Sequence, residues 1–106
     1  MPFQLRLTRE AEEDLQQLLD FIIQRELHRN NNSDLQVAQA ALDAIEKGFD
    51  TLKLAPFSCR KSAQNPFLRE LIISFGHSGY VALFEVENAQ MVSIAAVRHQ
   101  NEDDYH

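Results

Sequence analysis

The chain has 106 residues, the length of one domain, and its 44% hydrophobic and 25% charged residues are the balance of a globular protein. With 3 Gly and 3 Pro, the sequence excludes collagen-like and low-complexity arrays, and no apolar run reaches the roughly 18–20 residues of a membrane helix. Its net charge of −6, from 10 basic and 16 acidic side chains, opposes binding to duplex or ribosomal nucleic acid.

Two features predict a cytoplasmic protein without a membrane partner. Residues 1–4 do not form a basic segment followed by a long apolar one, so we expect no secretory signal. Cys59 is the one cysteine in the sequence, so an internal disulfide cannot form. A small domain without disulfides is typical of a reducing compartment.

The first predicted elements are a strand and a helix. Residues 3–8 alternate apolar and polar side chains, which predicts a half-buried strand. Thr8 suits the N-cap of the helix that follows, and acidic residues crowd the first turns, where the helix dipole favours anions. Apolar residues at helical spacing then predict a helix from about Arg9 to about His28.

A second helix is predicted after an asparagine-rich turn. Ser33 and Gln36 have the spacing of a capping box, which marks the start of the helix. Pro56 ends it at or before Ala55. Gly48 lies inside the helix and weakens it by up to about 1 kcal/mol relative to alanine.

The rest of the chain predicts a sheet. Residues 57–66 form a polar connection, and three strands follow at 67–75, 80–86 and 90–97, joined by two short turns. We therefore predict one α+β domain over residues 1–106, a two-layer sandwich. Its order is strand–helix–helix–three-strand antiparallel meander, with the helical hairpin packed on one face of the sheet.

The order of these elements, together with the residues at their joints, resembles the RelE/ParE superfamily of type II toxins. The long helical hairpin, the LREL strand and the VRH ending make the chain more similar to the ParE-like, or plasmid-stabilisation, branch. The segments that carry the resemblance are LTREAEEDL at 7–15, LKLAP at 52–56, LREL at 68–71, GYVALFEV at 79–86, and VRH at 97–99 with Asp103 and Asp104 beyond it.

The resemblance implies a cytoplasmic toxin encoded beside an antitoxin, with no cofactor. ParE-like members poison DNA gyrase without breaking bonds, whereas RelE-like members cut mRNA on the ribosome. We expect the ParE-like function, gyrase inhibition neutralised by a cognate antitoxin. The alternatives are a ribosome-dependent mRNA endoribonuclease of RelE type and a degenerate member that only binds antitoxin. Val81 stands where many relatives have arginine, and with the acidic net charge it disfavours the nuclease.

For the nuclease alternative, the candidate catalytic residues are Arg69, Arg98, His99 and Tyr80. The arginines would stabilise the charged transition state, the histidine would transfer a proton, and the tyrosine would stack on a base or approach a phosphate. Each has a structural interpretation as well. Arg69 would form an ion pair with Glu85, His99 would be hydrogen-bonded at a strand end, and Tyr80 would pack with its hydroxyl at the surface.

For binding to a target or an antitoxin, the sequence offers basic and apolar side chains. Arg60 and Lys61 are its one consecutive basic pair and suit a phosphate contact, although solvated loop charges are the ordinary alternative. The strands are apolar on both sides, so we expect the uncovered sheet face and the edge of the helical hairpin to bind the antitoxin. The candidate set is Arg60, Lys61, Arg69, Leu71, Ile73 and Arg98.

Three minor candidates complete the sequence analysis. Cys59 adjoins a basic pair, and nearby cations lower the pKa of a thiol. Phe21 lies off the apolar stripe of its helix and would be a partner contact if exposed. No metal site is predicted, because four residues near the C-terminus match no ligand spacing: His99, Asp103, Asp104 and His106.

Overall fold

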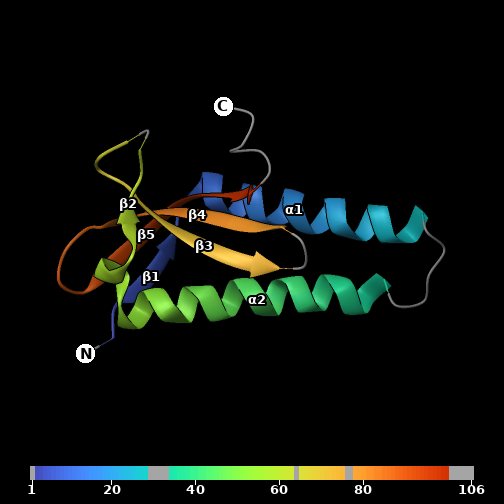
Figure 1. The fold of residues 1–106 in the computed structure, drawn as a ribbon, viewed down its shortest axis with the longest axis horizontal. Coiled ribbons are helices and arrows are strands. Elements are labelled where there is room, and N and C mark those ends of the chain that lie inside the picture. Colours follow the sequence, from blue (N-terminus) through green and yellow to red (C-terminus); the bar gives the residue numbers. More distant parts are fainter. Residues whose placement is uncertain (1, 29–33, 64, 76–77, 101–106) are drawn as a thin grey trace.

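The computed structural model describes residues 2–28, 34–63, 65–75 and 78–100, and it has two layers, a pair of helices and a five-stranded sheet (Figure 1). This confirms the predicted fold class. In the described ranges, no helix is long and apolar enough to cross a membrane. The elements are β1 (Gln4–Leu7), α1 (Arg9–His28), α2 (Asp34–Leu54), the short 3-10 helix η1 (Pro56–Ser58), β2 (Arg60–Lys61), β3 (Arg69–Phe75), β4 (Ser78–Val86) and β5 (Met91–His99).

The strand order in the sheet is β1–β5–β4–β3–β2. Strands β3, β4 and β5 form the predicted antiparallel meander. The first strand lies parallel to the last, with Gln4 opposite Met91 and Leu7 opposite Ile94. The two-residue strand β2 pairs with the start of β3 inside a segment predicted to be a loop. The first predicted strand is therefore an edge strand of the sheet, and β2 is a strand that the sequence did not predict.

The core lies between the helices and one face of the sheet. Helix α1 packs on β5 and helix α2 on β3. Side chains alternate along β3, so Leu71, Ile73 and Phe75 face the helices while Ile72 faces the other way. The buried cluster consists of Ala11, Ile22, Ala41, Ile45, Leu52, Ile73, Tyr80, Ala82, Phe84, Val92, Ile94 and Val97.

Two glycines converge on Ile73. A Cβ atom on Gly48 of α2 would lie 2.9 Å from Cγ1 of Ile73, whose side chain is only 4% exposed. A Cβ atom on Gly79 of β4 would lie 2.1 Å from the Ile73 carbonyl oxygen. The sequence marks Gly48 as a weak point of the helix, and the structure supplies the compensating reason, a close approach of α2 to β3.

The start of α1 completes the outer edge of β5 where β1 ends. The Ala11 backbone N–H donates to the Thr8 hydroxyl at 3.2 Å, which confirms the predicted N-cap. That hydroxyl donates to the Ala95 carbonyl at 3.1 Å, and the Asp14 carboxylate accepts the Val97 N–H at 3.1 Å. The side chains of Thr8 and of Asp14 in α1 thus bind backbone groups of β5 beyond the end of its pairing with β1.

Candidate functional site

Arg69 begins β3 and is half-buried. Its Nη1 atom donates to the Cys59 carbonyl at 2.7 Å, and its guanidinium carbon lies 5.3 Å from the centroid of the Phe57 ring. The strand register places it opposite Phe84, and among the described residues it forms no ion pair with Glu85. The structural interpretation made from the sequence is therefore corrected, since a carbonyl and an aromatic ring take the place of the carboxylate.

Arg60 and Lys61 form β2 at the edge of the sheet. Arg60 pairs with the carboxylate of Glu70, which lies opposite it in the register. Lys61 is exposed and has no ion pair within the described part of the chain. Lys61 is therefore more available than Arg60 to bind an anionic partner, because Arg60 already has a counter-ion.

Leu71 and Ile73 lie on the sheet face that α2 covers. Ile73 is buried, whereas Leu71 is half-buried and lines a groove of about 580 Å³ between α2 and β3. Strand β2 pairs only with Arg69 and Glu70, so beyond these residues the outer edge of β3 has no neighbouring strand in the described part of the sheet. The groove is lined by Ala40, Asp43, Ala44, Lys47, Gly48, Thr51, Leu71, Ile72, Ile73 and Ser74.

Tyr80 and His99 meet on the helix-covered face. Their ring centroids are 5.8 Å apart in an edge-to-face contact, and Tyr80 also stacks on Phe75 with centroids 6.1 Å apart. Arg98 is exposed on the opposite face, where it lies across from Val81. Tyr80 is buried, so it matches the structural interpretation of a packed strand tyrosine.

The four nuclease candidates do not converge on one site. Arg69 lies opposite Phe84, while Tyr80 lies opposite Ile73, four residues further along β3. At about 3.3 Å per residue, that separation is roughly 13 Å along the strand. Arg98 lies on the other face of the sheet. The structure therefore groups Tyr80 with His99 and leaves the two arginines apart from them and from each other.

The open face of the sheet carries a polar cluster beside its apolar residues. Arg6 donates to Glu87 at 2.8 Å and to the Ser93 hydroxyl at 3.1 Å, and this hydroxyl donates to Glu87 at 2.7 Å. Ile72 is 41% exposed on the same face. The open face is thus only partly apolar, and its charges near β1 neutralise each other.

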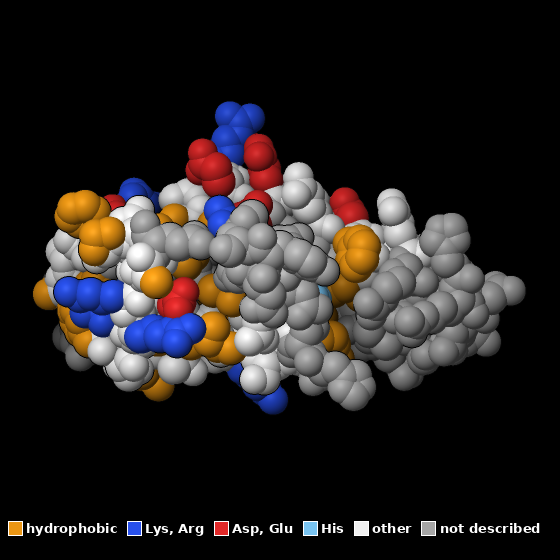
Figure 2. Space-filling view, turned by 45° about the horizontal axis from the view of Figure 1, so that its top comes forward, with side chains coloured by type: hydrophobic (Ala, Val, Ile, Leu, Met, Phe, Trp, Pro, Cys, Tyr) orange, Lys and Arg blue, Asp and Glu red, His pale blue; other side chains and the backbone are white. Residues whose placement is uncertain are grey.

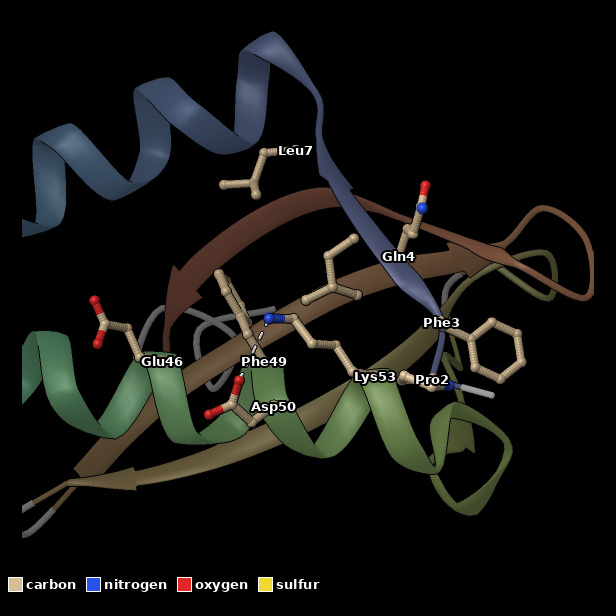
Figure 3. A pocket seen from close by; sticks show the side chains of 9 residues that line it. Pro2, Phe3, Gln4, Leu7, Glu46, Phe49, Asp50 and Lys53 are labelled. Atoms are coloured by element: carbon tan, nitrogen blue, oxygen red, sulfur yellow. Dashed lines mark ion pairs between the residues drawn. The ribbon is translucent and has the colours of Figure 1, made fainter.

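A larger groove of about 930 Å³ opens between β1 and α2 (Figure 3). Leu7 and Phe49 point into it from the two elements, and the ion pair between Lys53 and Asp50 lies on its α2 side, with 3.5 Å between nitrogen and oxygen. The backbone N–H of Phe3 donates to the Lys53 carbonyl at 2.7 Å and holds the end of the groove closed. Sequence reasoning missed both grooves because each is lined by residues from a helix and a strand that are far apart in the sequence.

The minor candidates have different outcomes. Burial raises the pKa of the Cys59 thiol, outweighing a hydrogen bond with Ser58 and the charge of Arg69, which lower it. The expected lowering is therefore wrong in sign. Phe21 is 60% exposed and remains a candidate contact. In the described ranges, no three His, Cys, Asp or Glu side chains are grouped to hold a metal. Residues 103, 104 and 106 lie outside those ranges.

Sequence reasoning also missed an exposed aromatic surface at the β2 end of the molecule. The sequence predicts a polar connection at 57–66 and a strand from residue 67, but Phe57 is 62% exposed on η1 and Phe67, which precedes β3, is 81% exposed. Figure 2 shows hydrophobic and basic side chains side by side at this end. A signal was available in the sequence, because no acidic residue occurs between Asp50 and Glu70.

Comparisons with known proteins agree with this architecture. Residues 5–104 match the family model described as the ParE toxin of the type II toxin–antitoxin system parDE. Comparison with curated proteins gives no match. Among solved structures, a chain of the chromosomal ParDE toxin–antitoxin system from P. aeruginosa is similar in fold. The TM-score is 0.68 at 18% identity, and the match covers 92% of this chain and 95% of the other. Because the family match extends over nearly the whole chain, this protein belongs to the ParE toxin family of type II toxin–antitoxin systems.

Proposed function

We propose that this toxin inhibits DNA gyrase by binding to it, without bond-breaking chemistry, and that a cognate antitoxin neutralises it. The observation that carries the proposal is the dispersal of the nuclease candidates. Cleavage at a ribose 2′-hydroxyl needs a base, an acid and cations around one phosphate. Here Tyr80 and His99 pack against each other, Arg69 is about four residues away along the sheet, and Arg98 is on the other face.

Charge supports the same proposal. Val81, which stands where many members of the superfamily have arginine, is 3% exposed and lies opposite Arg98. The open face therefore lacks a second cation beside Arg98 at that position. With a net charge of −6, the chain would also be repelled by an RNA-lined site.

The antitoxin is proposed to bind along the edges of the helical hairpin. The two grooves flank α2, one against β1 and the other against β3. Each is open and lined partly by apolar side chains, which suits a segment that orders on binding. Beyond Glu70 the outer edge of β3 has no neighbouring strand in the described sheet, and this edge, with Ile72 exposed on it, borders the second groove.

Two parallel assays test the target. Purified toxin is added to DNA gyrase, and supercoiling is followed on a relaxed plasmid. The same toxin is added to a translation extract, and mRNA ends are mapped. We expect loss of supercoiling and no new mRNA ends. Codon-positioned cuts that vanish in Arg98→Ala or His99→Ala, and persist in the exposed control Arg9→Ala, would establish the nuclease instead. Inactivity in both assays would favour a degenerate member that only binds antitoxin.

Hydrogen exchange tests the antitoxin surface. The cognate antitoxin is co-expressed with the toxin, and amide exchange is compared with and without it. We expect added protection in α2 and in residues 71–75, next to the two grooves. Unchanged protection in both segments would contradict the proposed surface, whatever the outcome of the gyrase assay.

A further inference from the structure

Large apolar side chains gather at the end of the molecule that carries η1 and β2. In the described ranges, five large hydrophobic residues are strongly exposed, and three of them, Leu54, Phe57 and Phe67, lie within fourteen positions of one another. Exposed apolar groups of this size are uncommon when clustered and mark contact sites for partners. The other two are Phe21 on α1 and Ile72 on β3.

The same segment is basic in an acidic chain. Residues 51–69 contain Lys53, Arg60, Lys61 and Arg69 and no aspartate or glutamate. Two of these cations have counter-ions, since Lys53 pairs with Asp50 and Arg60 with Glu70. Lys61 and Arg69 remain without a carboxylate partner among the described residues, so the surface combines aromatic rings with two available positive charges.

The central ring of this surface is held in place before any partner arrives. Phe57 follows the buried Pro56 in η1, and the Phe3 ring meets it edge to face with centroids 6.2 Å apart. The guanidinium of Arg69 lies over the Phe57 ring, with its carbon 5.3 Å from the ring centroid, and donates a hydrogen bond to the Cys59 carbonyl. An aromatic side chain that is already ordered loses little conformational entropy on binding.

The charge of this surface selects a protein rather than a nucleic acid. Nucleic-acid affinity grows with the number of phosphates neutralised, and two available cations beside a chain of net charge −6 are too few. A pairing of Phe and Arg side chains is the composition of a protein–protein hot spot. An exposed ring held by its neighbours, such as Phe57, fits a pocket on a folded partner, whereas the grooves along α2 fit a segment.

We propose that this end of the molecule, the Phe57 surface (Leu54, Phe57, Lys61, Phe67 and Arg69), inserts into an apolar pocket bordered by carboxylates on the toxin's protein target. The inference rests on the proposed function, because it takes the target to be a folded protein. The Phe57 surface adjoins the β1–α2 groove through Phe3 but shares no lining residue with either proposed antitoxin groove. Toxin variants should therefore exist that bind antitoxin normally and no longer recognise their target.

The test uses full-length toxin with two variants, Phe57→Ala/Phe67→Ala and Lys61→Glu. The matched controls are Phe21→Ala, an equally exposed ring on α1, and Arg9→Glu, an exposed cation far along the chain. Three properties are measured: affinity for purified gyrase, growth arrest on induced expression, and co-purification with the antitoxin. Lys61→Glu changes no buried side chain, so it keeps the test valid if the double variant fails to fold.

We expect both Phe57-surface variants to bind gyrase at least tenfold more weakly, to lose growth arrest and to retain the antitoxin, while the controls behave as wild type. Two results would overturn the inference. Both variants could bind gyrase as tightly as wild type, or they could stop co-purifying with antitoxin while they still bind gyrase and arrest growth. If wild-type toxin ignores gyrase but growth arrest still depends on the Phe57 surface, the inference stands and gyrase is the wrong target. A wild-type toxin that neither binds gyrase nor arrests growth would overturn both.

Discussion

The close approach of α2 to β3 gives a stability prediction with opposing contributions. Gly48→Ala improves helix propensity by about 1 kcal/mol. The new methyl group would lie 2.9 Å from Cγ1 and 3.0 Å from Cδ1 of Ile73, and 3.2 Å from Cδ2 of Leu71. Overpacking of this kind costs about 1–3 kcal/mol, and Ile73 has little room to move because it is buried. We expect Gly48→Ala to lower the free energy of unfolding by about 1 kcal/mol net.

A double-mutant cycle isolates that contact. Ile73→Ala removes the two closest of the three crowding atoms, leaving the end of the half-buried Leu71 side chain, which can shift into the vacated space. By itself Ile73→Ala costs about 2–5 kcal/mol. In that background Gly48→Ala should stabilise by about 1 kcal/mol, which gives a coupling free energy of about 2 kcal/mol between the two sites.

Urea unfolding followed by circular dichroism measures these free energies. The variants Glu46→Gly and Glu46→Ala, at an exposed position of α2, calibrate the local difference between glycine and alanine. If Gly48→Ala in the wild-type background stabilises as much as Glu46→Ala does relative to Glu46→Gly, the close contact costs nothing and the reasoning fails.

Three further predictions follow from single contacts. Gly79→Ala forces a Cβ atom against the Ile73 carbonyl and should cost about 3 kcal/mol or more in the same unfolding assay; a loss below about 1 kcal/mol would contradict the geometry. Thr8→Ala removes the N-cap and a bond to β5 and should cost about 1–2 kcal/mol, whereas Thr8→Ser, which keeps the hydroxyl, should lose less than half of that. Burial raises the pKa of Cys59 above its ordinary 9.0, so the folded thiol keeps its proton where the unfolded thiol loses it. Folding stability should therefore fall as pH rises from about 9 toward the folded pKa, and Cys59→Ser should abolish that part of the pH dependence.

The sequence predicts the elements of this fold better than their neighbours in space. Helix α1 and the three meander strands follow from periodicity, and Thr8 caps the start of α1 as its residue type predicts. The parallel pairing of β1 with β5 could not be read from a pattern, because it is set by how the hairpin folds back over the sheet. Strand β2 was missed because its residues, Arg60 and Lys61, have no strand periodicity.

The candidate site was predicted less completely, for a physical reason. Alternation alone places Arg98 and His99 on opposite faces, and the register agrees. The sign of the Cys59 pKa shift depends on burial, which a neighbouring cation in the sequence does not reveal. The partner of Arg69 is a backbone carbonyl, a group that residue types do not mark.

The pairing of β1 with β5 has a consequence for synthesis of the toxin. Arg6 meets Ser93, 87 positions later, so the first strand has no sheet neighbour until almost all of the chain has been made. Contacts this distant in sequence slow folding and leave apolar strands uncovered in the meantime. A chain that stops before β5 would lack this pairing, so the sheet is completed only after Met91–Ile94 have been made. A partner that recognises the completed sheet can therefore bind only after β5 has been made.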